Sequence, residues 1–123
     1  MDSDILVVDD SAAIRKILQR VLRQTGMPIK DIHEAGDGQQ ALDVLKAQKV
    51  NLVLTDINMP NMDGLQLLAA LKASQEWASI PVVMITTEGG EARVAEAVRL
   101  GAVGYVRKPF TADQIKEKLA GVL

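Results

Sequence analysis

The sequence contains no cysteine and only three aromatic residues, one each of Trp, Tyr and Phe. Without cysteine the chain can form neither disulfide bonds nor thiolate metal sites. Hydrophobic residues nevertheless make up 48% of the sequence, so a core can form, and it must be built almost entirely from aliphatic side chains. A chain of this length is expected to fold as one domain, residues 1–123.

The chain also lacks an excess of basic residues and any long hydrophobic run. Fourteen Lys and Arg face sixteen Asp and Glu, giving a net charge of -2 and a pI near 5.3, which argues against a nucleic-acid-binding module. No apolar run approaches the roughly 20 residues that span a bilayer, and the acidic N-terminus lacks the basic flank of a signal peptide. We therefore expect a soluble cytoplasmic protein that inserts into no membrane.

Short apolar runs alternate five times with segments of helical periodicity. Such alternation predicts an α/β fold in which helices cover both faces of a parallel sheet. With five units the strand order 2-1-3-4-5 is the first choice among several that periodicity leaves open. Ser11 and Asp37 are expected to cap helices, and Thr111 with Gln114 has the pattern of a capping box. The predicted strands are residues 5–8, 29–35, 50–54, 80–85 and 104–107, and the apolar positions of the helices span residues 14–22, 41–45, 65–71, 94–100 and 115–122.

Polar residues stand at the ends of four predicted strands: Asp9 and Asp10, then Asp56, Thr86 and Lys108. The carboxyl ends of parallel strands meet at one edge of a sheet, so these side chains should converge. Three carboxylates at one place repel one another and raise one another's pKa, so a cation is expected among them. Because the candidate ligands are oxygen atoms, with no Cys and no clustered His, that cation is expected to be Mg²⁺. Asp56 is then the candidate nucleophile for a phosphoryl group, with Lys108 and the Thr86 hydroxyl stabilising its charge.

Each of these residues also has a simpler interpretation. Asp9 and Asp10 could cap the first helix, Thr86 could cap a turn, and an isolated lysine such as Lys108 is most often solvated. Outside this group, the basic residues of the first helix (Arg15, Lys16, Arg20 and Arg23) are expected to form a solvated face that could also contact an acidic kinase, His33 to be a polar strand residue, and Trp77 to cover an edge of the core.

Four segments carry a resemblance to a known family: VVDDS at 7–11, DINMPNMDG at 56–64, ITTE at 85–88 and GYVRKPF at 104–110. Over its whole length the chain resembles the response-regulator receiver domains of two-component systems, above all the single-domain chemotaxis members. The resemblance implies a flavodoxin-like (βα)5 three-layer sandwich with strand order 2-1-3-4-5.

The resemblance also implies residue roles. Asp56 would be the phosphoacceptor. Mg²⁺ would be bound by Asp10, by Asp56 and by the backbone carbonyl of Asn58, with Asp9 acting through water. Lys108 would pair with the phosphoryl group, and its peptide bond to Pro109 would be cis. Thr86 and Tyr105 would form the conformational switch.

The implied function is a signalling switch that catalyses only its own phosphorylation and dephosphorylation. A sensor histidine kinase of the chemotaxis type would supply the phosphoryl group. The fourth helix, fifth strand and fifth helix would bind an effector, such as a flagellar motor switch protein or a phosphatase. The chain would be a monomer or a weak, phosphorylation-dependent dimer. Chemotaxis members often carry lysines where residues 89–91 read GGE, so the usual charges for motor docking are absent there.

Three other classes compete with this interpretation. A phosphatase of the haloacid-dehalogenase type needs a second Asp two residues after the nucleophile, where this chain has Asn58, and a cap domain for which 123 residues leave no room. A flavodoxin needs a Ser/Thr/Gly-rich phosphate loop after the first strand and aromatic residues beside the flavin. A receiver that serves only as a scaffold would not need the complete set of site residues.

Overall fold

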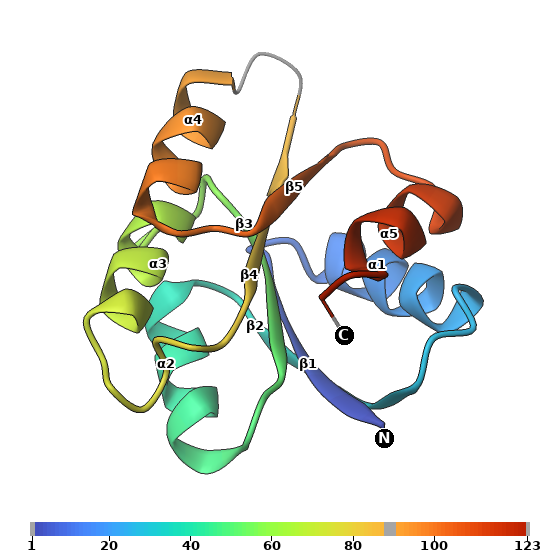
Figure 1. Ribbon diagram of the computed structural model, residues 1–123, viewed down its shortest axis with the longest axis horizontal. Helices are drawn as coiled ribbons and strands as arrows, with labels where there is room; N and C mark the ends of the chain where they lie inside the picture. The colour runs from blue at the N-terminus through green and yellow to red at the C-terminus, as the bar shows by residue number, and fades with distance from the viewer. Residues whose placement is uncertain (1, 88–90, 123) are drawn as a thin grey trace.

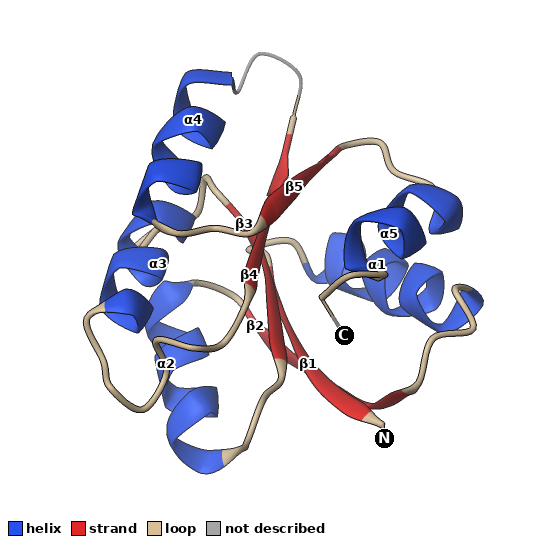
Figure 2. Ribbon diagram, viewed as in Figure 1, coloured by secondary structure: helices blue, strands red, loops and turns tan. Residues whose placement is uncertain are grey.

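The computed structural model describes residues 2–87 and 91–122. In it five strands and five helices alternate along the chain (Figures 1 and 2). None of these helices is both long enough and apolar enough to cross a membrane. The strands are β1 (Ser3–Val8), β2 (Ile29–Ala35), β3 (Leu52–Asp56), β4 (Val82–Thr86) and β5 (Gly104–Arg107). The helices are α1 (Ala12–Gln24), α2 (Gly38–Ala47), α3 (Gly64–Lys72), α4 (Glu91–Leu100) and α5 (Ala112–Leu119).

The five strands form one parallel sheet in the order β2-β1-β3-β4-β5. Helices α2, α3 and α4 cover one face, and α1 and α5 cover the other (Figure 1). The predicted flavodoxin-like, three-layer arrangement is therefore confirmed. β2 lies on one side of β1 and β3 lies on the other. The connections that follow β1 and β3 therefore run in opposite directions across the sheet. Open α/β sheets bind their ligands at such a topological switch point, beyond the carboxyl ends of the strands.

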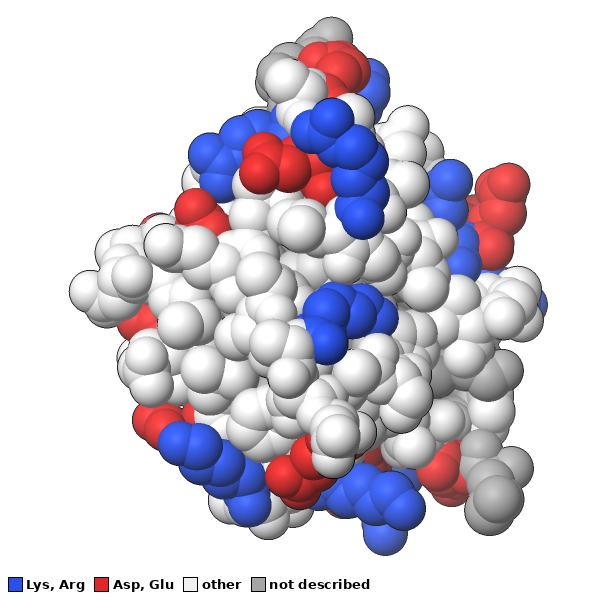
Figure 3. Space-filling view, turned by 60° about the vertical axis from the view of Figure 1, so that its left-hand side comes forward, with Lys and Arg blue, Asp and Glu red and all other residues white. Residues whose placement is uncertain are grey.

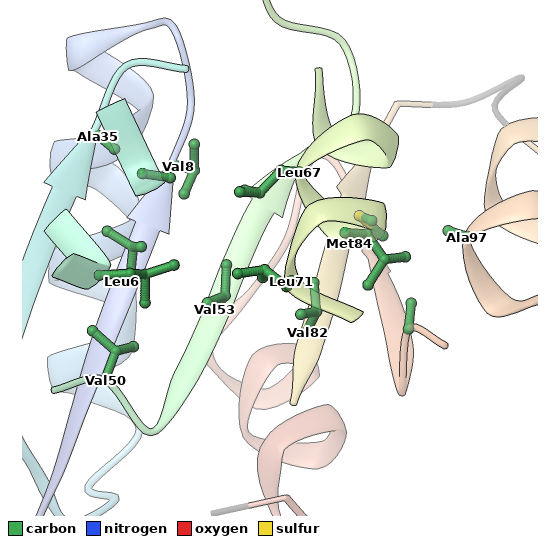
Figure 4. Packing of buried hydrophobic residues seen from close by; sticks show 14 of the residues in the cluster. Leu6, Val8, Ala35, Val50, Val53, Leu67, Leu71, Val82, Met84 and Ala97 are labelled. Carbon is green, nitrogen blue, oxygen red and sulfur yellow. The ribbon is translucent and has the colours of Figure 1, made fainter. Parts of the chain in front are cut away.

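The core is divided into two clusters by the sheet. Successive residues of a strand point to opposite faces, so Leu6 and Val8 of β1 pack under α2 and α3 while Ile5 and Val7 pack under α1 and α5. Figure 4 shows the first cluster, in which side chains of the sheet meet those of α3. Trp77 packs against the edge of this cluster, as predicted. Fully buried side chains of this size each contribute about 1.5–3 kcal/mol.

Local sequence fixes where several helices begin. Ser11 caps α1 by accepting a hydrogen bond from a backbone N–H of the first turn, and Thr111 with Gln114 forms the predicted capping box of α5. Asp63 and Gln66 form a second capping box at α3 that we did not predict, although the sequence carries the same spacing there. Asp37 caps α2, as expected.

The boundaries of three strands differ from the predicted ones, and β1 begins at Ser3, two residues earlier than expected. β3 and β4 each begin two residues later than expected, because Val50 and Ile80 pack against the core without joining the ladder and Pro81 has no N–H to donate. Each strand also extends further, so Asp56 and Thr86 are the last residues of their strands. The last helix ends at Leu119, and Val122 packs beyond it. Glu88 of the ITTE segment lies outside the described residues. So do Gly89 and Gly90 of the GGE segment, where chemotaxis members often carry lysines.

Candidate functional site

Three acidic side chains meet at the carboxyl edge of the sheet, between the neighbouring strands β1 and β3. Asp9 directly follows β1 and is 1% exposed, whereas Asp10 is exposed. Asp56 ends β3, and its side chain is 13% exposed. One carboxylate oxygen from each residue lies within 4.8 Å of the others. The structure thus brings together the three acids that the sequence placed at strand ends.

Lys108 connects two of these acids. It follows β5, and its Nζ lies 3.1 Å from Asp9 Oδ2 and 3.4 Å from Asp56 Oδ2. Its peptide bond to Pro109 is cis, as expected. Burial alone would lower the pKa of the Lys108 ammonium, but the hydrogen bond to Asp9 and the charge of Asp56 outweigh burial and raise it. The lysine is therefore a fixed cation in the site and not a solvated side chain.

Asp56 lies in a different electrostatic environment from an ordinary surface acid. Burial raises the pKa of its carboxyl group, and the nearby charge of Asp9 raises it further, while Lys108 acts in the opposite direction. A carboxylate that is partly desolvated between a like charge and a cation gains from any additional positive charge placed beside it.

The acid cluster fits a small divalent cation. Its donors are carboxylate oxygens, which are hard ligands of the type that Mg²⁺ prefers. Oxygens bonded to Mg²⁺ at about 2.1 Å lie roughly 3 Å apart when adjacent and roughly 4.2 Å apart when opposite. Ligand atoms within 4.8 Å of one another therefore have to close by at most about 2 Å to reach one ion. Asp10, Asp56 and Asp9 could therefore hold Mg²⁺, with Asp9 also engaged by Lys108.

Thr86 and Tyr105 line one hollow beside the acid cluster. The hollow has a volume of about 180 Å³ and lies between β4, β5 and α4. Thr86 is buried, and its hydroxyl donates to the backbone carbonyl of Thr87 at 3.1 Å. Tyr105 is 36% exposed, and the Lys118 ammonium lies 5.4 Å from the centre of its ring. The two predicted switch residues are thus adjacent, with the tyrosine facing outward.

The loop between β3 and α3 is held tightly against the strand that carries Asp56. The Gly64 N–H donates to the carbonyl of Ile57 at 2.7 Å, and a Cβ at Gly64 would lie 2.3 Å from the carbonyl oxygen of Asp56. Asn61, which has a positive φ of 65°, donates to Asp37 at 2.8 Å. This bond fastens the loop that contains the exposed Asn58 to the start of α2.

Several contacts of charged side chains were not predicted. Arg15 was expected on a solvated face, but its side chain is only 18% exposed and bonds to Asp9 and Glu34. An ion pair between α4 and the β3–α3 loop was not predicted either. Away from the site, His33 lies 4.0 Å from Asp4 at the amino end of β1. Apart from Arg15 and Asp9, which are six residues apart, the partners are distant in sequence, and no spacing rule links them. The sequence carried no local signal for these contacts, because Arg15 and Arg93 lie within helices and His33 lies within β2.

On the face that carries α2, α3 and α4 the surface charge is mixed. Figure 3 views the side of the molecule that carries α2, α3 and α4, where acidic and basic side chains are interspersed near the two ends and a largely uncharged band separates them. On this face no extended basic surface of the kind that binds nucleic acids is seen.

Comparisons with known proteins agree with this geometry. A sequence model of the response regulator receiver domain matches residues 5–120. The chain is 42% identical over 120 residues to a Chemotaxis protein CheY homolog of Campylobacter jejuni, covering 97% of this chain and 91% of the relative. It is 44% identical over 115 residues to Chemotaxis protein CheY-3 of Vibrio cholerae, covering 94% and 87%. The solved structure of chemotaxis response regulator CheY4 of Vibrio cholerae superposes with a TM-score of 0.87 at 29% identity, with both chains fully covered. With an acid cluster and a half-buried lysine at the switch point of this sheet, the chain belongs to the family of response regulator receiver domains.

Proposed function

We propose that this receiver domain, a signalling switch, is activated when Asp56 accepts a phosphoryl group from a phosphohistidine of a sensor histidine kinase. The observation that carries the proposal is the position of the Asp56 carboxylate, at the end of β3, with two acids on one side and the Lys108 ammonium 3.4 Å away. The Asp56 side chain is 13% exposed, so a phosphodonor can reach it from solvent. The charges of Asp9, Asp10 and Lys108 lie around it.

In the proposed reaction a carboxylate oxygen of Asp56 attacks phosphorus, and the P–N bond to the donor imidazole breaks. The electron pair of that bond stays on the imidazole nitrogen, which takes up a proton from solvent. Lys108 offsets the charge of the transferring group, and the Thr86 hydroxyl turns from its carbonyl partner to donate to a phosphoryl oxygen. Mg²⁺ held by Asp10, Asp56 and the Asn58 carbonyl, with Asp9 through water, would supply further positive charge to the phosphoryl oxygens.

The phosphoryl group then acts as a ligand that biases two conformations. Movement of Thr86 toward it would vacate part of the 180 Å³ hollow, into which the Tyr105 ring can turn. This would change the α4–β5–α5 face, where large hydrophobic side chains are unusually exposed. They are Val98 (53%), Leu100 (38%), Val103 (54%) and Tyr105 (36%).

We infer that this face binds the effector. The similarity to chemotaxis proteins supports a chemotaxis pathway with a motor switch protein or a phosphatase as the partner. We further propose that residues 1–123 act as one receiver domain and that this domain works in the cytoplasm. It would be a monomer, or a weak dimer when phosphorylated. Asn58 supports a switch over a turnover phosphatase, since it lacks the carboxylate that such a phosphatase uses as its acid.

Acetyl phosphate with Mg²⁺ tests the central step. We expect the wild type to gain the mass of one phosphoryl group, measured by intact-protein mass spectrometry, and chelation of Mg²⁺ to prevent the gain. Asp56→Asn should show no gain, whereas Asp43→Asn, an exposed acid on α2, should behave as the wild type. An unmodified wild type, or a fully modified Asp56→Asn, would disprove the assignment.

A further inference from the structure

Arg15 joins three elements beside the acid cluster. It lies in the second turn of α1, and its Nη1 donates to the backbone carbonyl of Asp9, just beyond β1. Its Nε donates to Glu34 Oε1 on β2 at 3.0 Å. The Arg15 side chain is 18% exposed and that of Glu34 is 41% exposed. The guanidinium group is planar, and its N–H groups point in fixed directions like the prongs of a fork. The bond to Glu34 therefore fixes the orientation in which Nη1 reaches the Asp9 carbonyl.

The other polar groups of Asp9 already have partners. Its N–H donates to the carbonyl of Ala35 at 3.1 Å, Oδ1 accepts from the Ser11 N–H at 2.9 Å, and Oδ2 accepts from Lys108 at 3.1 Å. The contact from Arg15 fixes the remaining group, the carbonyl oxygen. The peptide that joins Asp9 to Asp10 is planar, so holding this carbonyl also sets the direction in which Asp10 leaves the strand.

Asp10 has no comparable support of its own. Across residues 2–87 and 91–122 no hydrogen bond or ion pair is made by the Asp10 carboxylate, which is exposed but has an oxygen within 4.8 Å of those of Asp9 and Asp56. Its place in the cluster therefore depends on the backbone before it. Arg15 is the only side chain of the described residues that bonds to the carbonyl of that connecting peptide.

Two simpler roles explain the contacts of Arg15 less well. As an anchor for α1 it is superfluous, because Leu18 and Leu22 are fully buried and Ser11 caps the helix. As a docking cation for a kinase it is poorly placed, since its donors are engaged inside the chain and most of the side chain is covered.

We propose that Arg15, braced by Glu34, is a positioning residue that sets the direction of the Asp10 carboxylate and so determines how tightly the acid cluster binds Mg²⁺. The inference rests on the proposed function, because it concerns the same site.

The sign of the effect separates positioning from charge. If Arg15 acted only through its positive charge, removing it would make the acid cluster more negative and tighten Mg²⁺ binding. If Arg15 positions Asp10, removing it lets the carboxylate move away and weakens binding. Arg15→Gln therefore gives opposite results under the two interpretations, and charge effects fade in salt while a positional effect remains.

Calorimetric titration of each protein with Mg²⁺ alone, without phosphodonor, makes the measurement. We expect Kd to rise about tenfold in Arg15→Gln, the lower end of what losing an outer partner of a metal ligand costs. Arg15→Lys keeps the charge but not the fork and should also weaken binding. The matched control is Arg20→Gln, which removes the same charge from an exposed position of α1 and should leave Kd unchanged. Unchanged or tighter binding in Arg15→Gln would overturn the proposal.

If Arg15→Gln folds poorly, Arg15→Lys is tested by a second measurement, nuclear magnetic resonance of the backbone amides. In Mg²⁺-free protein, the amide resonance of Asp10 should shift in Arg15→Lys and stay in place in Arg20→Gln, and an unshifted resonance counts against the proposal. The outcome is separable from that of the proposed function. A wild type that binds Mg²⁺ but is not modified by acetyl phosphate contradicts only the function. A wild type that is modified, with unchanged Mg²⁺ affinity in Arg15→Gln, contradicts only the role of Arg15.

Discussion

At the scale of single residues, Lys108 stabilises an arrangement of charges that would otherwise be unfavourable. Asp9 is 1% exposed and shares the edge of the sheet with Asp56, and both carboxylates bond to the same ammonium group. A buried acid that loses its only cationic partner keeps its desolvation cost without compensation. In the absence of metal the lysine therefore has a structural role in addition to the proposed chemical one.

Replacing Lys108 by Met should lower the free energy of unfolding by about 1–3 kcal/mol in Mg²⁺-free buffer, because the buried Asp9 carboxylate loses its cationic partner. Urea unfolding followed by circular dichroism measures the change. Adding Asp9→Asn to Lys108→Met should restore much of the loss, since the uncompensated charge is then gone. Lys49→Met, at an exposed position, is the control and should have little effect. A double variant no more stable than Lys108→Met would contradict this account.

At the scale of elements, α4 is attached to the molecule differently from α3. Four residues of α3 are buried, whereas Ala97 is the one buried residue of α4. Polar contacts supplement this small apolar contact area. Arg93 donates to Asp63 at 3.1 Å, and Arg107 of β5 lies 3.5 Å from Glu91. Because Asp63 caps α3 at the end of the loop after Asp56, the first of these pairs links α4 directly to that loop.

Loss of the Arg93–Asp63 ion pair should loosen α4. Such partly exposed pairs contribute about 0.2–1 kcal/mol, so Arg93→Gln should speed amide hydrogen exchange in residues 91–100 by up to about fivefold. Exchange in α3 should change less, because its buried leucines remain. Arg99→Gln removes a charge from the same helix, where the described residues provide no ion-pair partner, and should leave exchange unchanged. Equal acceleration in both variants would show that the pair does not anchor α4.

At the scale of the whole molecule, two loops at the carboxyl edge of the sheet are fastened through Asp37. Its carboxylate accepts from the Asn61 side chain at 2.8 Å and from the Gln40 N–H at 2.8 Å. The hydrogen bond from Asn61, and then that from Gln40, hold the pKa of Asp37 below its usual 3.8. The Gly38 N–H also donates to the Met62 carbonyl at 2.9 Å, so the two loops are joined by main chain as well.

This shift predicts a pH dependence of global stability. Unfolded Asp37 takes up its proton near 3.8, whereas the folded form does so only at lower pH. The contribution of this carboxylate is therefore complete above 3.8 and is lost as pH falls through the folded pKa. Between about pH 5 and pH 2 the urea midpoint of the wild type should fall more than that of Asp37→Asn. Emission of Trp77, the only tryptophan, reports unfolding. Asp43→Asn should follow the wild type, and parallel curves for the wild type and Asp37→Asn would refute the prediction.

The sequence alone determined the alternation of strands and helices, because apolar periodicity is a local property that each segment carries in its own residues. The helix caps at Ser11 and Thr111 are local in the same way. Asp56, Thr86 and Lys108 could be assigned to one site since parallel strands end at a common edge. The strand order itself came from family resemblance and not from periodicity. The starts of β3 and β4 were predicted two residues too early, because Val50 and Ile80 are apolar and pack against the core. A residue can pack there without pairing with a neighbouring strand.

Only the tertiary structure decided which charged and polar side chains meet across elements. The bonds that join Arg15 to Glu34, Asn61 to Asp37 and Arg93 to Asp63 span 19, 24 and 30 residues of sequence. No spacing rule encodes such pairs, because the partners lie on different elements whose separation depends on how the layers pack. Arg15 is the clearest example. Its sequence position predicts a solvated helix face, and the fold places it against the backbone that leads into the acid cluster.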